Sequence, residues 1–212
     1  MIRVLIADDH AVVRQGLKQI LGNTPEMLVA GEATNGQEVL DKVRAETWDV
    51  VVLDISMPDR SGLDILKQLR SERPKLPVLV LSMYSEDQFA VRVLKAGACG
   101  YLTKDSAPDE LVKAIRKVVS GGTYVSAFLA EKLAMEIGIG TDSSKLPHEA
   151  LSDREFQVLR LIAAGKSVKE IAAELYLSVK TVSTYRSRLL QKMNLGTNAE
   201  LIHYAIQNRL ID

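Results

Sequence analysis

The sequence predicts an α/β fold, a doubly wound parallel sheet of five strands, followed by a small all-α domain. Over the first 120 residues, short apolar runs alternate five times with amphipathic helical segments, which is typical of βα units that feed a parallel sheet. From about residue 148 the apolar residues recur at helical spacing to the end of the chain. The length of 212 residues is sufficient for two small domains with separate cores.

The alternation assigns the elements in order. Strands are expected at residues 2 to 7, about 28 to 33, 49 to 54, 77 to 82 and 99 to 102. Helices are expected near residues 11 to 21, 36 to 45, 62 to 72, 86 to 96 and 107 to 120. Start signals are Asn35 before a Gln-Glu first turn, Ser85 in a Ser-Glu-Asp-Gln capping box, and Pro108 at a first helical position. Gly22, Gly97 and Gly121 follow helices where a left-handed residue is favoured.

A linker separates the two predicted domains. Residues 126 to 137 form one more expected helix, and the segment 138 to 147 then combines two glycines, a proline and small polar residues without an apolar period. This composition predicts mobility between the domains. The predicted parts are a first domain at 1–121, a linker with one helix at 122–147, and a helical domain at 148–212.

Charge is distributed unevenly between the two halves. Residues 1 to 150 hold 18 Lys+Arg and 21 Asp+Glu, a net charge of −3, whereas residues 151 to 212 hold 9 and 6, a net charge of +3. A basic second half favours a polyanionic partner. The alternative is that the charges of a neutral protein happen to be divided unevenly. Cys99 is the only cysteine, and we find neither a long apolar run nor a signal-peptide pattern. We therefore expect a cytoplasmic protein that does not insert into membranes.

Three carboxylates are expected to meet at one edge of the sheet. Asp54 ends the apolar run that begins at Val50, and Asp8 and Asp9 follow the first strand. In a flavodoxin-like strand order, the first and third strands are neighbours, and their carboxyl ends present ligand groups. Oxygen ligands of this kind suit Mg²⁺. Two simpler interpretations remain: Asp54 caps a turn, or the acids form a solvated cluster. His10 is expected to begin the first helix rather than to bind metal.

A hydroxyl and an amine follow the next two strands. Ser82 closes the fourth strand, and Lys104 follows the fifth. Each alone is an ordinary residue of its type. Together with a metal and a carboxylate, however, they supply what an aspartyl phosphate needs to form and to be held.

The motifs of this region resemble the receiver domain of bacterial two-component response regulators, over about residues 1 to 120. The resemblance is carried by Asp8-Asp9, Asp54 with Met57-Pro58 and Gly62, Ser82, and Tyr101-x-x-Lys104. It implies that a sensor histidine kinase phosphorylates Asp54, and that Mg²⁺ is held by Asp8, Asp9, Asp54 and the backbone carbonyl of Ser56. Lys104 and Ser82 would bind the phosphoryl group, and Tyr101 would turn inward when Ser82 moves. Met83 is bulkier than the residue often found there.

The second half carries a predicted helix-turn-helix. Between Lys166 and Arg188, two short helices flank the turn Tyr176-Leu177-Ser178. Capping patterns mark the helix starts at Ser152, Ser167, Ser178 and Thr197. An apolar stripe of Val179, Val182, Tyr185, Leu189 and Met193 is expected to pack inward. Lys180, Arg186, Arg188 and Lys192 give the same helix a basic face; a merely solvated face is the alternative.

Residues 148 to 212 are similar to the LuxR-type helix-turn-helix domain, through Leu151-Ser-x-Arg-Glu155, Gly165, Ile171-Ala172 and Ser178-x-Lys180-Thr181-Val182. The whole chain therefore resembles the NarL/FixJ class of response regulators. The resemblance implies base-edge contacts from Ser183, Thr184 and Ser187, and phosphate contacts from Lys180, Thr181, Arg186 and Arg188. It also implies that Ala199, Ile202, His203 and Ile206 pair two DNA-bound domains on a two-fold operator in double-stranded DNA.

The resulting hypothesis is a transcription regulator and not an enzyme. Phosphorylation of Asp54 would shift the protein from a form that masks its recognition helix or last helix to a homodimer that binds DNA, with RNA polymerase as a further candidate partner. One alternative is a phosphohydrolase with Asp54 as nucleophile, although such enzymes usually carry a second acid two residues later, where this chain has Ser56. Another is a DNA-binding protein that works without phosphorylation.

Overall fold

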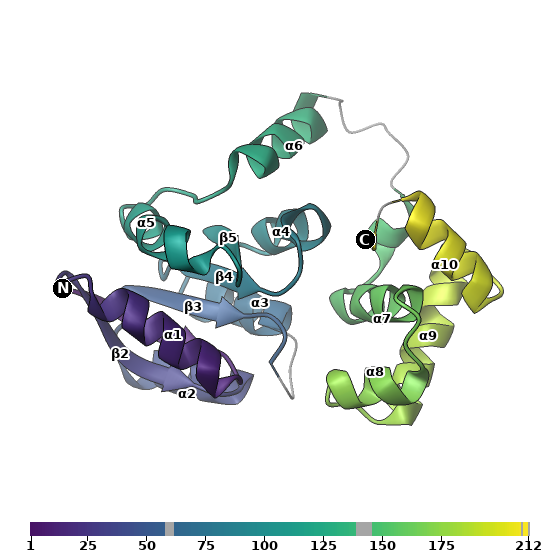
Figure 1. Ribbon diagram of the computed structural model, residues 1–212, viewed down its shortest axis with the longest axis horizontal. Helices are drawn as coiled ribbons and strands as arrows, with labels where there is room; N and C mark the ends of the chain where they lie inside the picture. The colour runs from purple at the N-terminus through teal and green to yellow at the C-terminus, as the bar shows by residue number, and fades with distance from the viewer. Residues whose placement is uncertain (58–61, 139–145, 209, 212) are drawn as a thin grey trace. The chain divides into compact units, whose positions relative to one another are not determined.

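The computed structural model describes residues 1–57, 62–138, 146–208 and 210–211, without the side chains of 87, 88, 132, 133, 135–138, 149 and 153. The chain forms two compact units, Met1–Ile139 and Gly140–Asp212 (Figure 1). The predicted linker helix, α6 (Ala127–Gly138), falls within the first unit. The domain boundaries predicted at 121 and 148 stay predictions.

The first unit is built on a five-stranded parallel sheet. The strands are β1 (Ile2–Ala7), β2 (Met27–Ala33), β3 (Val50–Asp54), β4 (Val78–Ser82) and β5 (Gly100–Thr103), in the order β2-β1-β3-β4-β5. Every residue of β3 and β4 is buried, because helices cover both faces of a parallel sheet and leave no side of a central strand in water. The predicted doubly wound fold is confirmed.

Five helices cover the sheet: α1 (Ala11–Gly22), α2 (Gly36–Ala45), α3 (Gly62–Glu72), α4 (Glu86–Lys95) and α5 (Ala107–Val119). Side chains alternate between the two faces of a strand, so Val50 and Val52 of β3 share one core with α1 and α5, whereas Val51 and Leu53 point to the other face. In Figure 1, α1 lies in front of the sheet and α3 behind it. Because the helices cover the faces of the sheet, the connecting loops lie at the carboxyl ends of the strands.

The predicted helix signals were partly right. Asn35 accepts the Glu38 N–H at 2.9 Å, Pro108 lies in the first turn of α5, and Gly97 and Gly121 have φ of 103° and 88°. The capping box at Ser85 is wrong: its buried hydroxyl makes no capping hydrogen bond, because the preceding turn is held by Ser82 and Tyr101 instead. Gly22 is also wrong as a left-handed cap, since it lies inside α1 and the helix ends at Asn23 with φ −81°.

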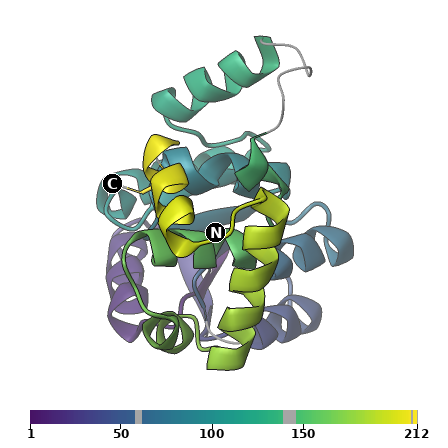
Figure 2. The same cartoon turned by 90° about the vertical axis from the view of Figure 1, so that its right-hand side faces the viewer.

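The second unit is helical. It consists of the short 3₁₀ helix η1 (Pro147–Ala150) and of α7 (Asp153–Ala163), α8 (Val168–Glu174), α9 (Val179–Met193) and α10 (Asn198–Gln207) (Figure 2). Reciprocal capping boxes start α7, α8 and α10, at Ser152, Ser167 and Thr197. Ser178 caps α9 by accepting the Thr181 N–H at 3.0 Å. All four predicted helix starts are confirmed.

A tight turn joins α8 to α9. Tyr176 adopts the left-handed conformation with φ 52°, and Leu177 N–H closes the turn by donating to Ala172 O at 2.8 Å. This bond satisfies a carbonyl that the helix end would otherwise leave without a partner. The predicted helix-turn-helix at Tyr176-Leu177-Ser178 is therefore present.

One side chain of α9 differs from its predicted place, and another has a partner that the sequence did not predict. Val182, Leu189 and Met193 are buried as expected, but Val179, the first residue of α9, is 47% exposed. Lys192 is exposed as predicted, but its Nζ also donates to Glu155 Oε2 of α7 at 2.7 Å.

Glu155 connects two helices of this unit. It is 3% exposed, receives the Ser152 N–H at 2.7 Å and pairs with Lys192. Burial disfavours its charged form, but the hydrogen bonds from Lys192 and Ser152 outweigh burial and lower the pKa of Glu155. Its stabilising contribution is therefore complete at neutral pH and is lost as the pH falls through that lowered pKa.

We expect Glu155→Ala to destabilise the second unit by about 2 kcal/mol, because the change leaves the Ser152 N–H and Lys192 without their acceptor. Chemical denaturation measures the change. The matched control is Glu170→Ala, which removes the equivalent residue of the α8 capping box but acts at an exposed site. Equal effects of the two substitutions would contradict the role assigned to the Lys192 pairing.

Among the described helices, none has the length and apolar character that crossing a bilayer requires.

Candidate phosphoryl-acceptor site and nucleic-acid interface

The carboxylates meet at the predicted edge of the sheet. β1 and β3 are adjacent and parallel, so Asp8 and Asp9, which follow β1, come beside Asp54, the last residue of β3. Ligand atoms of these three acids and of His10 all lie within 4.8 Å of one another. Asp8 and Asp54 are each only 1% exposed. Such proximity of buried acids demands neutralisation by cations.

Lys104 supplies one of these cations. Its Nζ lies 2.7 Å from both Asp8 Oδ2 and Asp54 Oδ2, and its backbone N–H donates to Ser82 O at 2.7 Å. Burial opposes the charge of Lys104, but Asp54 and Asp8 together raise its pKa. Burial also raises the pKa of Asp54, and the charge of Asp8 adds to this effect while Lys104 opposes it. The charge of Lys104 alone therefore does not offset the cost of burying the Asp54 carboxylate.

A divalent cation fits the remaining charge. Three carboxylates face one ammonium group, and their oxygens converge within reach of a single ion. Oxygen donors of this type are the preferred ligands of Mg²⁺. Asp54 Oδ1 accepts the Ser56 N–H at 2.8 Å, which fixes the carboxylate next to Ser56. The carbonyl of Ser56 as a ligand stays a prediction.

His10 begins α1 as expected, but it also contacts the acids. Its Nδ1 lies 2.8 Å from Asp9 Oδ1 and 3.2 Å from Asp8 Oδ1, and its side chain is 60% exposed. We did not predict these contacts from the sequence. An exposed imidazole is free to turn away, so its presence is compatible with a metal bound by the acids.

Ser82 and Tyr101 hold the same turn. Ser82 is fully buried, and its Oγ accepts the Tyr84 N–H at 3.1 Å. Tyr101 is also buried, and its hydroxyl donates to Tyr84 O at 2.6 Å. Tyr101 therefore already points inward, whereas the family resemblance implies that it turns inward only when Ser82 moves. The sequence could not predict these two contacts, because they involve the backbone of Tyr84 and nearly every residue carries the same backbone groups.

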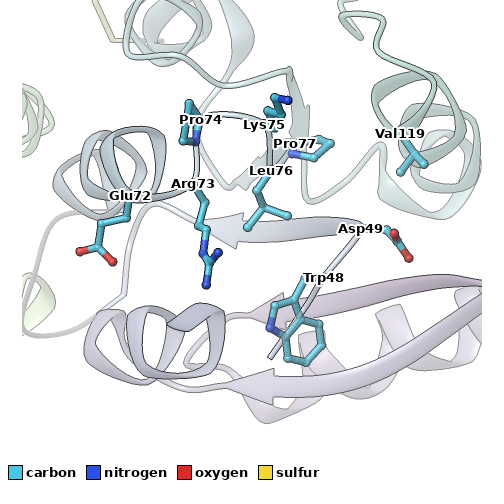
Figure 3. Close-up of a pocket in the computed structure, with 9 residues that line it drawn as sticks. All are labelled: Trp48, Asp49, Glu72, Arg73, Pro74, Lys75, Leu76, Pro77 and Val119. Carbon is cyan, nitrogen blue, oxygen red and sulfur yellow. The ribbon is translucent and has the colours of Figure 1, made fainter. Parts of the chain in front are cut away.

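The pocket shown in Figure 3 lies at the opposite edge of the sheet. Its volume is about 530 Å³, and Asp49 and Pro77, which precede β3 and β4, help to line it. Its acids are already bonded: Glu72 pairs with Arg44 at 2.6 Å, and Asp49 accepts the Arg3 N–H at 2.7 Å. This pocket is therefore separate from the candidate phosphoryl site.

The predicted DNA-binding residues lie along α9. Lys180, Ser183, Thr184, Ser187 and Arg188 are exposed, and Thr181 and Arg186 are half-buried. The hydroxyls of Ser183, Thr184 and Ser187 donate to backbone carbonyls four residues earlier, at 2.8, 3.0 and 3.0 Å. Such bonds leave the oxygens available as acceptors.

Arg186 differs from the other cations of this surface. Its Nε donates to Asn198 Oδ1 of α10 at 2.6 Å, so the side chain joins two helices in addition to any role toward DNA. Lys192 is bound to Glu155. Lys180 and Arg188 are exposed, as is Lys192.

The predicted dimer residues lie on the outer face of α10. Ala199, His203 and Ile206 are exposed and Ile202 is half-buried, whereas Leu201 and Ala205 pack inward. Ile206 is 59% exposed. The face is thus available to a partner.

Comparison with known proteins assigns both units. A family model of the response regulator receiver domain matches residues 4–116, and one of the luxR family of bacterial regulatory proteins matches residues 149–205. The chain is 38% identical over 210 residues to response regulator UvrY of Escherichia coli strain K12, covering 99% of this chain and 96% of that protein. It is 38% identical over 215 residues to oxygen regulatory protein NreC of Staphylococcus carnosus, covering 99% of each.

Among solved structures, the chain is similar to RcsB from Salmonella enterica serovar Typhimurium, bound to promoter rprA in the presence of the phosphomimetic BeF₃⁻. The TM-score is 0.65 at 29% identity, over 96% of this chain and 97% of that one.

Proposed function

Since this chain belongs to the NarL/FixJ class of two-component response regulators, which are transcription regulators and not enzymes, we propose that Asp54 accepts the phosphoryl group that controls its binding to DNA. One observation carries the proposal: at the end of β3, Lys104 Nζ lies 2.7 Å from a carboxylate oxygen of Asp54 and 2.7 Å from one of Asp8. A sensor histidine kinase is the proposed donor. The proposed compartment is the cytoplasm.

Each residue of the site has a chemical part in this proposal. Asp54 Oδ2, now bonded to Lys104, is the proposed nucleophile: it attacks phosphorus, the bond from phosphorus to the nitrogen of the kinase's phosphohistidine breaks, and the imidazole leaves. Lys104 then pairs with the phosphoryl oxygens. Ser82 rotates to donate its hydroxyl to the same group, and this rotation moves its oxygen away from the Tyr84 N–H. Mg²⁺, held by Asp8, Asp9, Asp54 and the Ser56 carbonyl, supplies charge neutralisation when bound.

The proposed output is DNA binding by two copies of the chain. Phosphorylation shifts the protein from a form that masks α9 or α10 to a homodimer on a two-fold operator. Base edges are contacted by Ser183, Thr184 and Ser187. Phosphates are contacted by Lys180, Thr181, Arg186 and Arg188. The dimer contact is formed by Ala199, Ile202, His203 and Ile206. RNA polymerase is a further proposed partner. The exposed side chains on α9 and α10 support this division of roles.

The direct test uses the full chain and a small phosphodonor, acetyl phosphate. Intact-mass measurement should show one added phosphoryl group with Mg²⁺ and a strong decrease with EDTA, because the carboxylates otherwise repel the incoming anion. Dimer content and DNA affinity should rise with phosphoryl content. A chain that stays unmodified under these conditions would contradict the proposal.

The DNA surface has its own prediction. Lys180→Ala combined with Arg188→Ala should lower affinity for double-stranded DNA about tenfold or more and reduce the salt slope of log K by about 2, because two phosphate contacts are lost. Titrations at several salt concentrations measure both quantities. Lys192→Ala is the control, since this lysine lies on the same helix but is bonded to Glu155. An unaltered salt slope in the double variant would refute the proposed DNA surface.

A further inference from the structure

The turn between Ser82 and Glu86 lies between the phosphoryl site and the helix α6. At its start, Ser82 Oγ accepts the Tyr84 N–H at 3.1 Å, and the Tyr101 hydroxyl donates to Tyr84 O at 2.6 Å. The Tyr84 ring stacks on Phe89 of α4, with centroids 4.6 Å apart and planes inclined by 17°. The start of α4 is therefore fixed by a turn whose first anchor is a residue of the phosphoryl site.

Glu86 connects the other end of this turn to α6. Glu86 is the first residue of α4, and its carboxylate accepts a hydrogen bond from the hydroxyl of Ser126. The same hydroxyl accepts the Leu129 N–H at 3.1 Å and so caps the first turn of α6. Leu129 is fully buried, and α6 packs against α4. Ser126 is thus both the cap of α6 and its polar contact with α4.

The segment before Ser126 is anchored to the sheet. Tyr124 N–H donates to Cys99 O at 2.8 Å, and Tyr124 forms a parallel bridge with Gly100 of β5. A Cβ at Gly100 would lie 2.8 Å from Tyr124 O, so the two backbones are in close contact. Tyr124 also bonds to Glu110 of α5 through its hydroxyl. Because this anchor holds one side of the segment to the sheet, a movement of α4 changes the Glu86 contact and not the position of Tyr124.

We propose that Glu86 and Ser126 are positioning residues that transmit the phosphorylation state of Asp54 to α6, an inference that rests on the proposed function. When the Ser82 side chain rotates to donate its hydroxyl to the phosphoryl group, its oxygen moves away from the Tyr84 N–H and the start of α4 shifts. Glu86 then withdraws from Ser126. The first turn of α6, the last helix before the DNA-binding unit, is loosened as a result.

Hydrogen exchange on the full chain tests this coupling. In the wild-type protein, phosphorylation by acetyl phosphate with Mg²⁺ should increase amide exchange at Leu129 and Ala130 about tenfold, the effect of losing one charged hydrogen bond. Glu86→Ala removes the contact but keeps the Ser126 cap. In this variant, exchange at Leu129 and Ala130 should already be raised without phosphorylation, and phosphorylation should not raise it further. Ser126→Ala removes both bonds, and Ser126→Thr should restore the wild-type response.

The control is Ser120→Ala, whose hydroxyl bonds locally to Lys117 O at 2.8 Å, and it should respond as the wild type does. Intact-mass measurement of phosphoryl content separates the two hypotheses. A phosphorylated wild-type chain with unchanged exchange in α6 overturns the coupling alone, as does a Glu86→Ala chain that keeps the full response. A chain that takes no phosphoryl group on Asp54 overturns the proposed function and the coupling with it.

Discussion

Asp54→Asn is expected to form no acyl phosphate and to keep the DNA affinity of the unphosphorylated protein in the presence of any phosphodonor. The amide is a poor nucleophile, and no other described carboxylate of the cluster is both the last residue of a strand and bonded to Lys104. Intact-mass measurement and DNA titration with acetyl phosphate provide the readouts. An Asp54→Asn chain that binds DNA as tightly as phosphorylated wild type would refute control through this residue.

The same substitution should stabilise the fold when Mg²⁺ is absent. Burial raises the pKa of Asp54, so the folded state binds this proton more readily than the unfolded state, and stability is lost as the pH rises through the raised pKa. Asparagine has no such titration. We therefore expect a higher Tm than wild type at pH 8, a smaller difference at pH 4, and less additional stabilisation by Mg²⁺.

Thermal unfolding at both pH values, with and without Mg²⁺, measures these differences. Asp41→Asn is the control, because Asp41 is an exposed acid of α2, outside the cluster. It should leave the Tm and its dependence on Mg²⁺ nearly unchanged. A lower Tm for Asp54→Asn in EDTA would show that its hydrogen bonds outweigh the burial of its charge.

The sequence was sufficient for the sheet and the location of the site because both follow from periodicity. The run from Val50 to Asp54 is apolar on both faces, which only a central parallel strand accommodates, and the structure places β3 at those residues. Asp8, Asp54 and Lys104 then meet because the carboxyl ends of parallel strands lie at one edge.

Contacts between elements were not predictable in the same way. The pairing of Lys192 with Glu155 depends on the distance between two helices, which local spacing does not encode. Val179 matches the apolar period but is 47% exposed. Ser85 has the sequence of a capping box, yet the turn before it is fixed by a local bond from Tyr84 to Ser82 and a tertiary bond from Tyr101 to Tyr84. Tertiary contacts override local preference in each case.

Gly62→Ala is expected to destabilise the first unit by about 3 kcal/mol or more, because the added methyl group meets backbone atoms that cannot rotate away. A Cβ at this position would lie 2.3 Å from Ile55 Cα and 2.7 Å from Asp54 O. Gly62 N–H also donates to Ile55 O at 3.2 Å. The start of α3 therefore approaches the end of β3 too closely for any side chain.

Denaturation by urea measures the loss of stability, and Gly16→Ala is the matched control. Gly16 lies within α1, and a methyl group added there would meet no atom within 4 Å, so alanine at this position should stabilise by about 0.5 to 1 kcal/mol through helix propensity. In the Gly62→Ala chain, displacement of Asp54 by the added methyl group should also slow phosphorylation by acetyl phosphate in the molecules that remain folded. A stable Gly62→Ala chain with a normal phosphorylation rate would mean that the contact between α3 and β3 relaxes without disturbing the site, and that the glycine is not required for it.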